Sequence, residues 1–219
     1  MSEDRKGEAR RRRVRAVAPI LAELYPDLTV TLDYRTPLEL LVATILSAQC
    51  TDERVNRVTP ALFRRFPDAS AYAGADREEI EALVRPTGFY RNKAKHIQEM
   101  AARLVAEHEG EVPDTMDALV QLPGVARKTA NVLLANAFGR VEGIVVDTHV
   151  RRVAGRLDLT DHADPVRVER DLMDVVPREE WHAFAWRLIL HGRGRCRARR
   201  PDCEGCEIAG HCPSAGSFP

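Results

Sequence analysis

The strongest constraint on the fold is a turn that opens directly into a helix, at residues 121–131 (Gln-Leu-Pro-Gly-Val-Ala-Arg-Lys-Thr-Ala-Asn). Pro123-Gly124 is a turn pair, and the apolar residues after it recur at helical spacing until Gly139, which suits a helix C-terminus. The first amides of a helix lack partners inside it and carry positive partial charge, so such a start binds phosphate. Lys128 lies in the first turn of this predicted helix. The segment therefore combines an anion-binding turn with an amine.

The rest of the chain shows helical rather than strand periodicity. Helices are expected at residues 14–25, 38–47, 51–66, 76–83, 90–108, 114–120, 126–138, from 147 on, 165–175 and 179–191. Residues 1–13 are interpreted as a frayed, basic end, and Pro60 is expected to interrupt its helix. Val105 is placed on the buried side of the 90–108 helix. No segment alternates like a strand and no repeat of fixed period occurs, so the predicted class is all-α with short connections.

Charge is distributed unevenly along a chain whose formal net charge is zero. Residues 5–15 hold seven Arg or Lys, and residues 187–200 hold six Arg and no acid. Two basic segments in a neutral chain fit a polyanion bound on one face. Solvated surface arginines are the alternative, which composition alone leaves open.

The sequence shows neither a secretory signal nor a membrane span. Its N-terminus is charged and lacks an apolar core region, and the longest apolar run, residues 38–48, contains Glu39 and is too short for a bilayer. We therefore expect a cytoplasmic protein, in which structural disulfides are rare.

Four of the five cysteines lie within 17 residues, with the spacing C-x6-C-x2-C-x5-C: Cys196, Cys203, Cys206 and Cys212. In a cytoplasmic chain this pattern indicates a metal site, and four thiolates suit Zn²⁺ or an iron–sulfur cluster. Structural zinc usually shows two close pairs, whereas only one is present here, which favours a cluster. Few apolar residues lie between the cysteines, so metal binding would supply the free energy that folds this C-terminal segment. Cys50 is separate and is interpreted as a small buried hydrophobe.

The hairpin with Lys128, the segment Val146-Asp147-Thr148-His149-Val150 and the cysteine spacing together resemble the endonuclease III family. These proteins are helix–hairpin–helix DNA glycosylases with a [4Fe-4S] cluster, and the resemblance runs from about Val14 to Cys212. It implies a six-helix barrel domain with the hairpin at residues 30–141. It also implies a discontinuous iron–sulfur cluster domain made of residues 1–29 and 142–219. The expected protein is a monomer acting on double-stranded DNA that carries damaged bases or abasic sites.

The resemblance places Lys128 at the family's catalytic lysine and Asp147, 19 residues later, at its catalytic aspartate. It implies a bifunctional enzyme that removes oxidised pyrimidines and cuts 3′ to the abasic site through a Lys128 Schiff base. An amine is needed to attack C1′, and a carboxylate to help deprotonate the amine and to stabilise positive charge on the sugar. Without the resemblance, the ordinary interpretations are a solvated lysine and a helix cap.

DNA contacts are also implied by the resemblance. Gln49, in the Ser-Ala-Gln loop, corresponds to the residue that fills the gap left by the extruded base, and Phe89 to an apolar wedge. Their ordinary interpretations are a polar loop residue and a partly buried aromatic. The hairpin amides around Gly124 and Ala126 would hold a phosphate, and its carbonyls a monovalent cation. Phosphate contacts are further expected from three arginines between the first two clustered cysteines: Arg197, Arg199 and Arg200.

Three departures from the family pattern bear on activity. Ala126 stands where the hairpin usually has a second glycine, the segment between Gly139 and Asp147 is one residue longer than expected, and Phe89 replaces a frequent leucine. An adenine glycosylase of the same fold uses an acid before the glutamine loop, and residues 41–45 contain none. The remaining alternatives are a catalytically weak DNA-binding or redox-sensing module and a glycosylase of altered lesion specificity.

Overall fold

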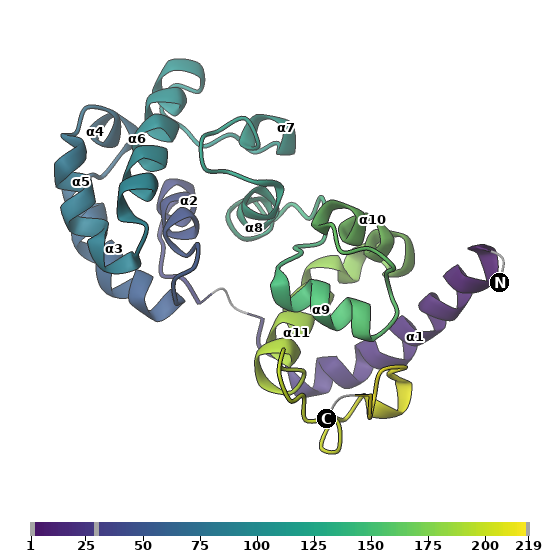
Figure 1. Cartoon of the computed structure of the whole chain (residues 1–219). Coiled ribbons are helices and arrows are strands. Elements are labelled where there is room, and N and C mark those ends of the chain that lie inside the picture. Colours follow the sequence, from purple (N-terminus) through teal and green to yellow (C-terminus); the bar gives the residue numbers. More distant parts are fainter. Residues whose placement is uncertain (1–2, 29–30, 218–219) are drawn as a thin grey trace. The chain divides into compact units, whose positions relative to one another are not determined.

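The computed structural model describes residues 3–28 and 31–217, and within these ranges it contains helices and no strands (Figure 1). The chain divides into two compact units. The internal unit is Thr29–Glu142, and the terminal unit combines Met1–Leu28 with Gly143–Pro219. The all-α prediction is confirmed. None of the helices in the described ranges is long and apolar enough to cross a bilayer.

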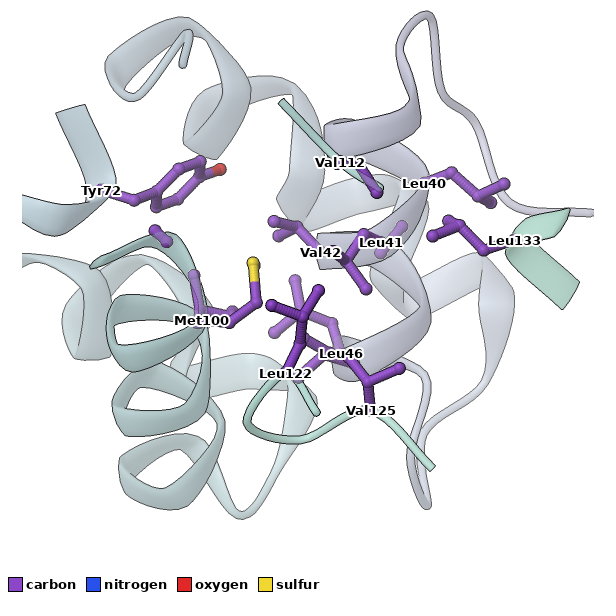
Figure 2. Close-up of a cluster of buried hydrophobic side chains, with 14 of the residues drawn as sticks. Leu40, Leu41, Val42, Leu46, Tyr72, Met100, Val112, Leu122, Val125 and Leu133 are labelled. Carbon is purple, nitrogen blue, oxygen red and sulfur yellow. The ribbon is translucent and has the colours of Figure 1, made fainter. Parts of the chain in front are cut away.

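The internal unit is built around α2 (Pro37–Leu46). The other helices of this unit are α3 (Asp52–Arg65), α4 (Ala69–Ala73), α5 (Arg77–Val84), η1 (Arg85–Thr87), α6 (Tyr90–Glu107), α7 (Met116–Leu119) and α8 (Arg127–Ala137). Six of the ten residues of α2 are buried, and the helix packs against α3, α6 and α8. Figure 2 shows its leucines meeting Met100 of α6, Leu133 of α8 and two hairpin residues, Leu122 and Val125. A helix that is apolar nearly all round is thus the centre of a core, as expected.

The terminal unit joins the two ends of the chain. It contains α1 (Glu3–Leu24), α9 (Thr148–Arg156), α10 (Pro165–Val175), η2 (Arg178–Glu180), α11 (Trp181–Gly194) and η3 (Ala209–His211). The long helix α11 packs against α9 and α1, and α10 also contacts both of them. The cysteine-bearing segment follows α11 in the same unit. Its position is therefore set by helices from both ends of the sequence.

Residues 3–13 are helical, which corrects the prediction of a frayed end. Arg10 Nη2 lies 2.7 Å from Asp161 Oδ2, and Arg13 Nη1 lies 2.9 Å from the Asp158 carbonyl oxygen. These partners lie about 150 residues away in sequence, in the loop after α9. Local sequence therefore gives no sign of the contacts that order the first turns of α1.

Two further expectations are wrong. Pro60 does not interrupt α3, since its ring is exposed while Val55, Val58 and Leu62 on either side are buried. Burying each such side chain contributes about 1.5–3 kcal/mol, which together outweighs the roughly 3 kcal/mol cost of an interior proline. Val105 is 42% exposed because the buried stripe of α6 passes through Leu104 and leaves its neighbour outside.

Candidate functional site

The hairpin before α8 requires glycine at one position. Gly124 has a φ of +78°, and a Cβ there would lie 2.9 Å from Cβ of His96 on α6. Both the backbone conformation and the close packing therefore exclude a side chain. Ala126 has φ −88° and ψ 166°, an ordinary extended conformation. The alanine that replaces the family's second glycine is consequently accommodated without backbone strain.

The N-terminus of α8 has no side-chain cap. Ala126 occupies the N-cap position and offers no hydrogen-bond acceptor to the first-turn amides. By contrast, six other helices have an N-cap residue whose side chain accepts a hydrogen bond from a first-turn amide. These N-cap residues are Thr36, Thr51, Asp68, Asp76, Asp147 and Asp164. Lys128 lies in this first turn and is exposed. The helix start thus presents amide hydrogens and an amine that an anionic ligand can reach.

Asp147 caps α9, as predicted. Its Oδ1 accepts both the His149 and the Val150 backbone N–H, each at 2.8 Å. A single oxygen satisfies both amides, so capping does not require Oδ2. Asp147 is half-buried and belongs to the terminal unit, whereas Lys128 belongs to the internal unit.

Three of the expected DNA contacts line one groove of about 320 Å³ in the internal unit: Gln49, Phe89 and Gly124. Gln49 follows α2, Phe89 precedes α6 and Gly124 precedes α8. Phe89 is 65% exposed, the most exposed of the large hydrophobic side chains in the described residues, so its interpretation as a core aromatic is wrong. The internal unit therefore gathers these three residues from segments far apart in sequence.

Three of the residues expected to contact DNA share an unusual backbone conformation. Five non-glycine residues in the described ranges have positive φ, and three of them are Gln49 (+52°), Phe89 (+47°) and Arg200 (+52°). Such a conformation costs free energy and persists only where the surroundings enforce it, which is typical of functional positions. Sequence reasoning missed this feature because none of the three is a residue type that favours positive φ.

Lys93 is a buried residue of the groove that sequence reasoning did not single out. Its Nζ donates to the Leu46 carbonyl at 2.7 Å and to the Thr87 carbonyl at 2.8 Å. Burial lowers the pKa of the Lys93 amine, although the nearby Cys50 thiol opposes that effect. Lys93 lies two positions before the exposed Lys95 in the same helix, so the sequence does not indicate which of the two lysines is buried.

The four clustered cysteines line one cavity of the terminal unit, together with the apolar side chains of Val153, Leu157 and Ile208: Cys196, Cys203, Cys206 and Cys212. His191 Nε2 lies 3.6 Å from Cys206 Sγ, and Arg156 Nη1 lies 3.2 Å from Cys196 Sγ. Burial raises the pKa of the Cys206 and Cys212 thiols.

The arrangement of the thiols bears on which metal they fit. In residues 3–28 and 31–217, no three His, Cys, Asp or Glu side chains are grouped closely enough to hold one metal ion. Tetrahedral zinc, with Zn–S of about 2.3 Å, requires sulfurs roughly 3.8 Å apart. A cubane cluster binds each cysteine to a different iron and so accommodates more widely separated sulfurs. The four thiols line a common cavity, and four thiolates are the donor set that a [4Fe-4S] cluster uses.

The cysteine loop carries arginines of two kinds. Arg197, Arg199 and Arg200 are exposed, as expected for phosphate contacts. Arg195 instead pairs with Asp202 at 2.7 Å and with Glu207 at 2.9 Å. Arg156, from α9, donates to the carbonyls of residues 197 and 198 and so fixes the loop backbone. Of the arginines in and around the cysteine loop, only some are therefore available to a ligand.

Comparisons with known proteins agree with this geometry. Residues 42–178 match the model of the HhH-GPD superfamily of base excision DNA repair proteins. The chain is 57% identical over 211 residues to endonuclease III of Synechocystis sp., covering 96% of each chain. It is 44% identical to endonuclease III of Bacillus subtilis, covering 88% of each.

Solved structures also match this chain. A trapped covalent intermediate of endonuclease III with DNA matches with a TM-score of 0.89 and 42% identity, over 94% of this chain and 97% of that one. A thermostable thymine-DNA glycosylase shares the fold, with a TM-score of 0.82 at 22% identity. Sequence and structure together show that this chain belongs to the endonuclease III family of the HhH-GPD superfamily.

Proposed function

We propose that the protein is a bifunctional DNA glycosylase and abasic-site lyase that removes oxidised pyrimidines from double-stranded DNA. The observation that carries this proposal is the exposed Lys128 in the first turn of a helix whose amides have no side-chain cap. A phosphate bound to those amides would bring the sugar of a neighbouring nucleotide within reach of an amine. The covalent endonuclease III–DNA intermediate of the similar structure supports the same chemistry.

In the proposed reaction, the neutral amine of Lys128 attacks C1′ while the C1′–N bond breaks and its electron pair leaves with the base. Asp147 helps take the proton from the amine and stabilises positive charge developing on the sugar. Opening of the sugar ring then gives a Schiff base between Nζ and C1′. Loss of a C2′ proton expels the 3′ phosphate by β-elimination, and water releases the lysine from the imine.

We assign DNA distortion to the groove of the internal unit. Gln49 would fill the space of the extruded nucleotide, and Phe89 would wedge into the stack. Amides near Gly124 and Ala126 would hold a phosphate without reading sequence, and turn carbonyls would bind a monovalent cation. The proposed cation site is tested by comparing DNA affinity in potassium and in tetramethylammonium salts of equal ionic strength. Exposed Arg197, Arg199 and Arg200 would add phosphate contacts and steepen the salt dependence of binding.

We further propose that the four cysteines of the terminal unit hold a [4Fe-4S] cluster. When bound, the cluster would cross-link a segment with little hydrophobic core and so contribute its folding energy. Iron and acid-labile sulfide should be near four per chain, with absorption at about 410 nm from thiolate-bound iron. Cys206→Ser should lower the iron content and destabilise the segment, and zinc as the only metal would contradict this assignment.

Borohydride trapping tests the proposed reaction directly. An oligonucleotide duplex containing thymine glycol should yield a covalent adduct with the parent protein and none with Lys128→Ala. The family match does not favour the alternative, a catalytically weak DNA-binding or redox-sensing module. If the metal-loaded parent protein formed no adduct, that result would support the alternative instead. A panel with 5-hydroxycytosine, dihydrouracil and plain abasic DNA would define the lesion range.

A further inference from the structure

Lys93 is nearly fully buried, at 4% exposure, although lysine is rarely buried without a paired charge. Its Nζ is 2.7 Å from one main-chain carbonyl oxygen and 2.8 Å from another, and neither acceptor is a carboxylate. Removing an ammonium from water costs free energy that these two charge-assisted hydrogen bonds offset. A lysine held in this way links the two backbone segments whose carbonyls it contacts.

The two acceptors lie at the base of the segments that carry Gln49 and Phe89. Leu46 ends α2, and Gln49 follows three residues later. Thr87 ends η1, and Phe89 follows two residues later. Helix C-terminal carbonyls carry negative partial charge, so an ammonium is favourable beside Leu46. One side chain therefore connects the end of α2 to the end of η1.

Both segments hold their exposed residue in a sparsely populated conformation. Gln49 and Phe89 have positive φ, and both line the groove that Lys93 also lines. Thr87 is itself buried, and its hydroxyl donates to the Val84 carbonyl at 2.8 Å. Such backbones persist only where neighbouring contacts enforce them, and the Lys93 amine donates a hydrogen bond at the base of each segment.

We propose that Lys93 is a positioning residue for base extrusion, one that holds Gln49 and Phe89 at the spacing with which they enter the duplex. The inference rests on the proposed function of the groove. Lys93 touches neither the reacting sugar nor Lys128 in this scheme. It acts through the backbones of two segments that must be rigid before DNA binds, because a preorganised wedge does not lose conformational entropy on entering the stack.

This role separates two reactions at the same site. A paired lesion must be unstacked before attack on C1′, which costs a few kcal/mol. A preformed abasic site has no base to unstack, so the amine can reach C1′ after a smaller distortion of the duplex. Loosening the two segments should therefore slow excision of a paired lesion more than cleavage of an abasic site.

The experiment compares Lys93→Met with Lys95→Met in the full-length, metal-loaded protein. Lys95 is on the same helix, its side chain is 53% exposed and it pairs with Glu99, so its substitution changes charge without touching either segment. Single-turnover rates are measured on one duplex sequence containing either thymine glycol or a preformed abasic site. Thermal unfolding is recorded for each variant.

Lys93→Met should lower the ratio of excision to abasic-site cleavage by about tenfold, as expected for the loss of buried hydrogen bonds. Lys95→Met should leave that ratio unchanged. Equal loss of both rates, or no loss, would overturn the proposal, because a purely structural role lowers both together. If Lys93→Met does not fold, Lys93→Gln, whose neutral amide NH₂ can still donate to a carbonyl, is judged by the same ratio. A parent protein inactive on both substrates would instead refute the proposed function itself.

Discussion

The helices α8 and α9 begin in opposite ways. At α8 the N-cap is Ala126, which leaves the first-turn amides without a side-chain acceptor. At α9 the N-cap is Asp147, and one carboxylate oxygen accepts two first-turn amides. A capped start is stabilised from within the protein, whereas an uncapped one depends on water or an external anion. In the proposed function, the uncapped start of α8 is where phosphate binds, and Asp147 combines its structural role at α9 with a chemical one.

The largest effect is expected from Lys128→Gln at the uncapped start. This change removes the nucleophile but leaves α8 intact, so Schiff-base trapping should disappear and strand cleavage should fall by about 10⁴-fold or more. DNA affinity should change little, because the proposed phosphate contacts come from backbone amides and from the loop arginines rather than from Lys128. Lys128→Arg, which keeps the charge without a nucleophilic amine, serves as the matched control and should also be inactive. Trapping that survives in both variants would assign the nucleophile elsewhere.

Asp147→Asn should separate the two roles of the capped start. Asparagine caps a helix about as well as aspartate, so the free energy of unfolding should stay within about 0.5 kcal/mol. Loss of the carboxylate should nevertheless slow the chemical step by about 10²–10⁴-fold. Asp147→Ala should add a stability loss of about 1 kcal/mol, measured by denaturant unfolding. Full activity in Asp147→Asn would leave Asp147 as a cap alone.

Gly124→Ala tests the turn that leads into α8. Positive φ and the short approach to His96 should together lower the free energy of unfolding by about 1–3 kcal/mol and weaken DNA binding. Gly155→Ala, in α9, is the contrasting variant, since no atom lies within 4 Å of its added Cβ. It should stabilise the protein by about 0.5–1 kcal/mol. Equal stability of the two variants would contradict the argument.

The smallest effect is expected from Ala126→Ser, which gives α8 the cap that it lacks. The serine hydroxyl should accept a first-turn amide and raise the free energy of unfolding by about 1 kcal/mol. It should also weaken DNA binding by about fivefold, because it competes with phosphate for that amide. Ala126→Gly provides the comparison without a hydroxyl. Tighter DNA binding by Ala126→Ser would show that the amides are not the phosphate site.

Elements whose signals are local were predicted well from the sequence. The periodicity of α8, the Asp147 cap of α9 and the apolar run of α2 each depend on residues within one helix. The errors have long-range causes. Residues 3–13 are ordered by carboxylate and carbonyl groups about 150 positions away, and Pro60 is tolerated because α3 packs against neighbouring helices.

The sequence by itself determined the helical class, the hairpin, the helix caps and the four thiols, because each is encoded by residue types at short spacing. Only the tertiary structure decided that Gln49, Phe89 and Gly124 line one groove and that Lys93 lies buried beneath two of their segments. It also decided which arginines near the cysteines are exposed and which are paired. Burial and long-range hydrogen bonds depend on how distant segments pack, and the order of residues along the chain does not specify them locally.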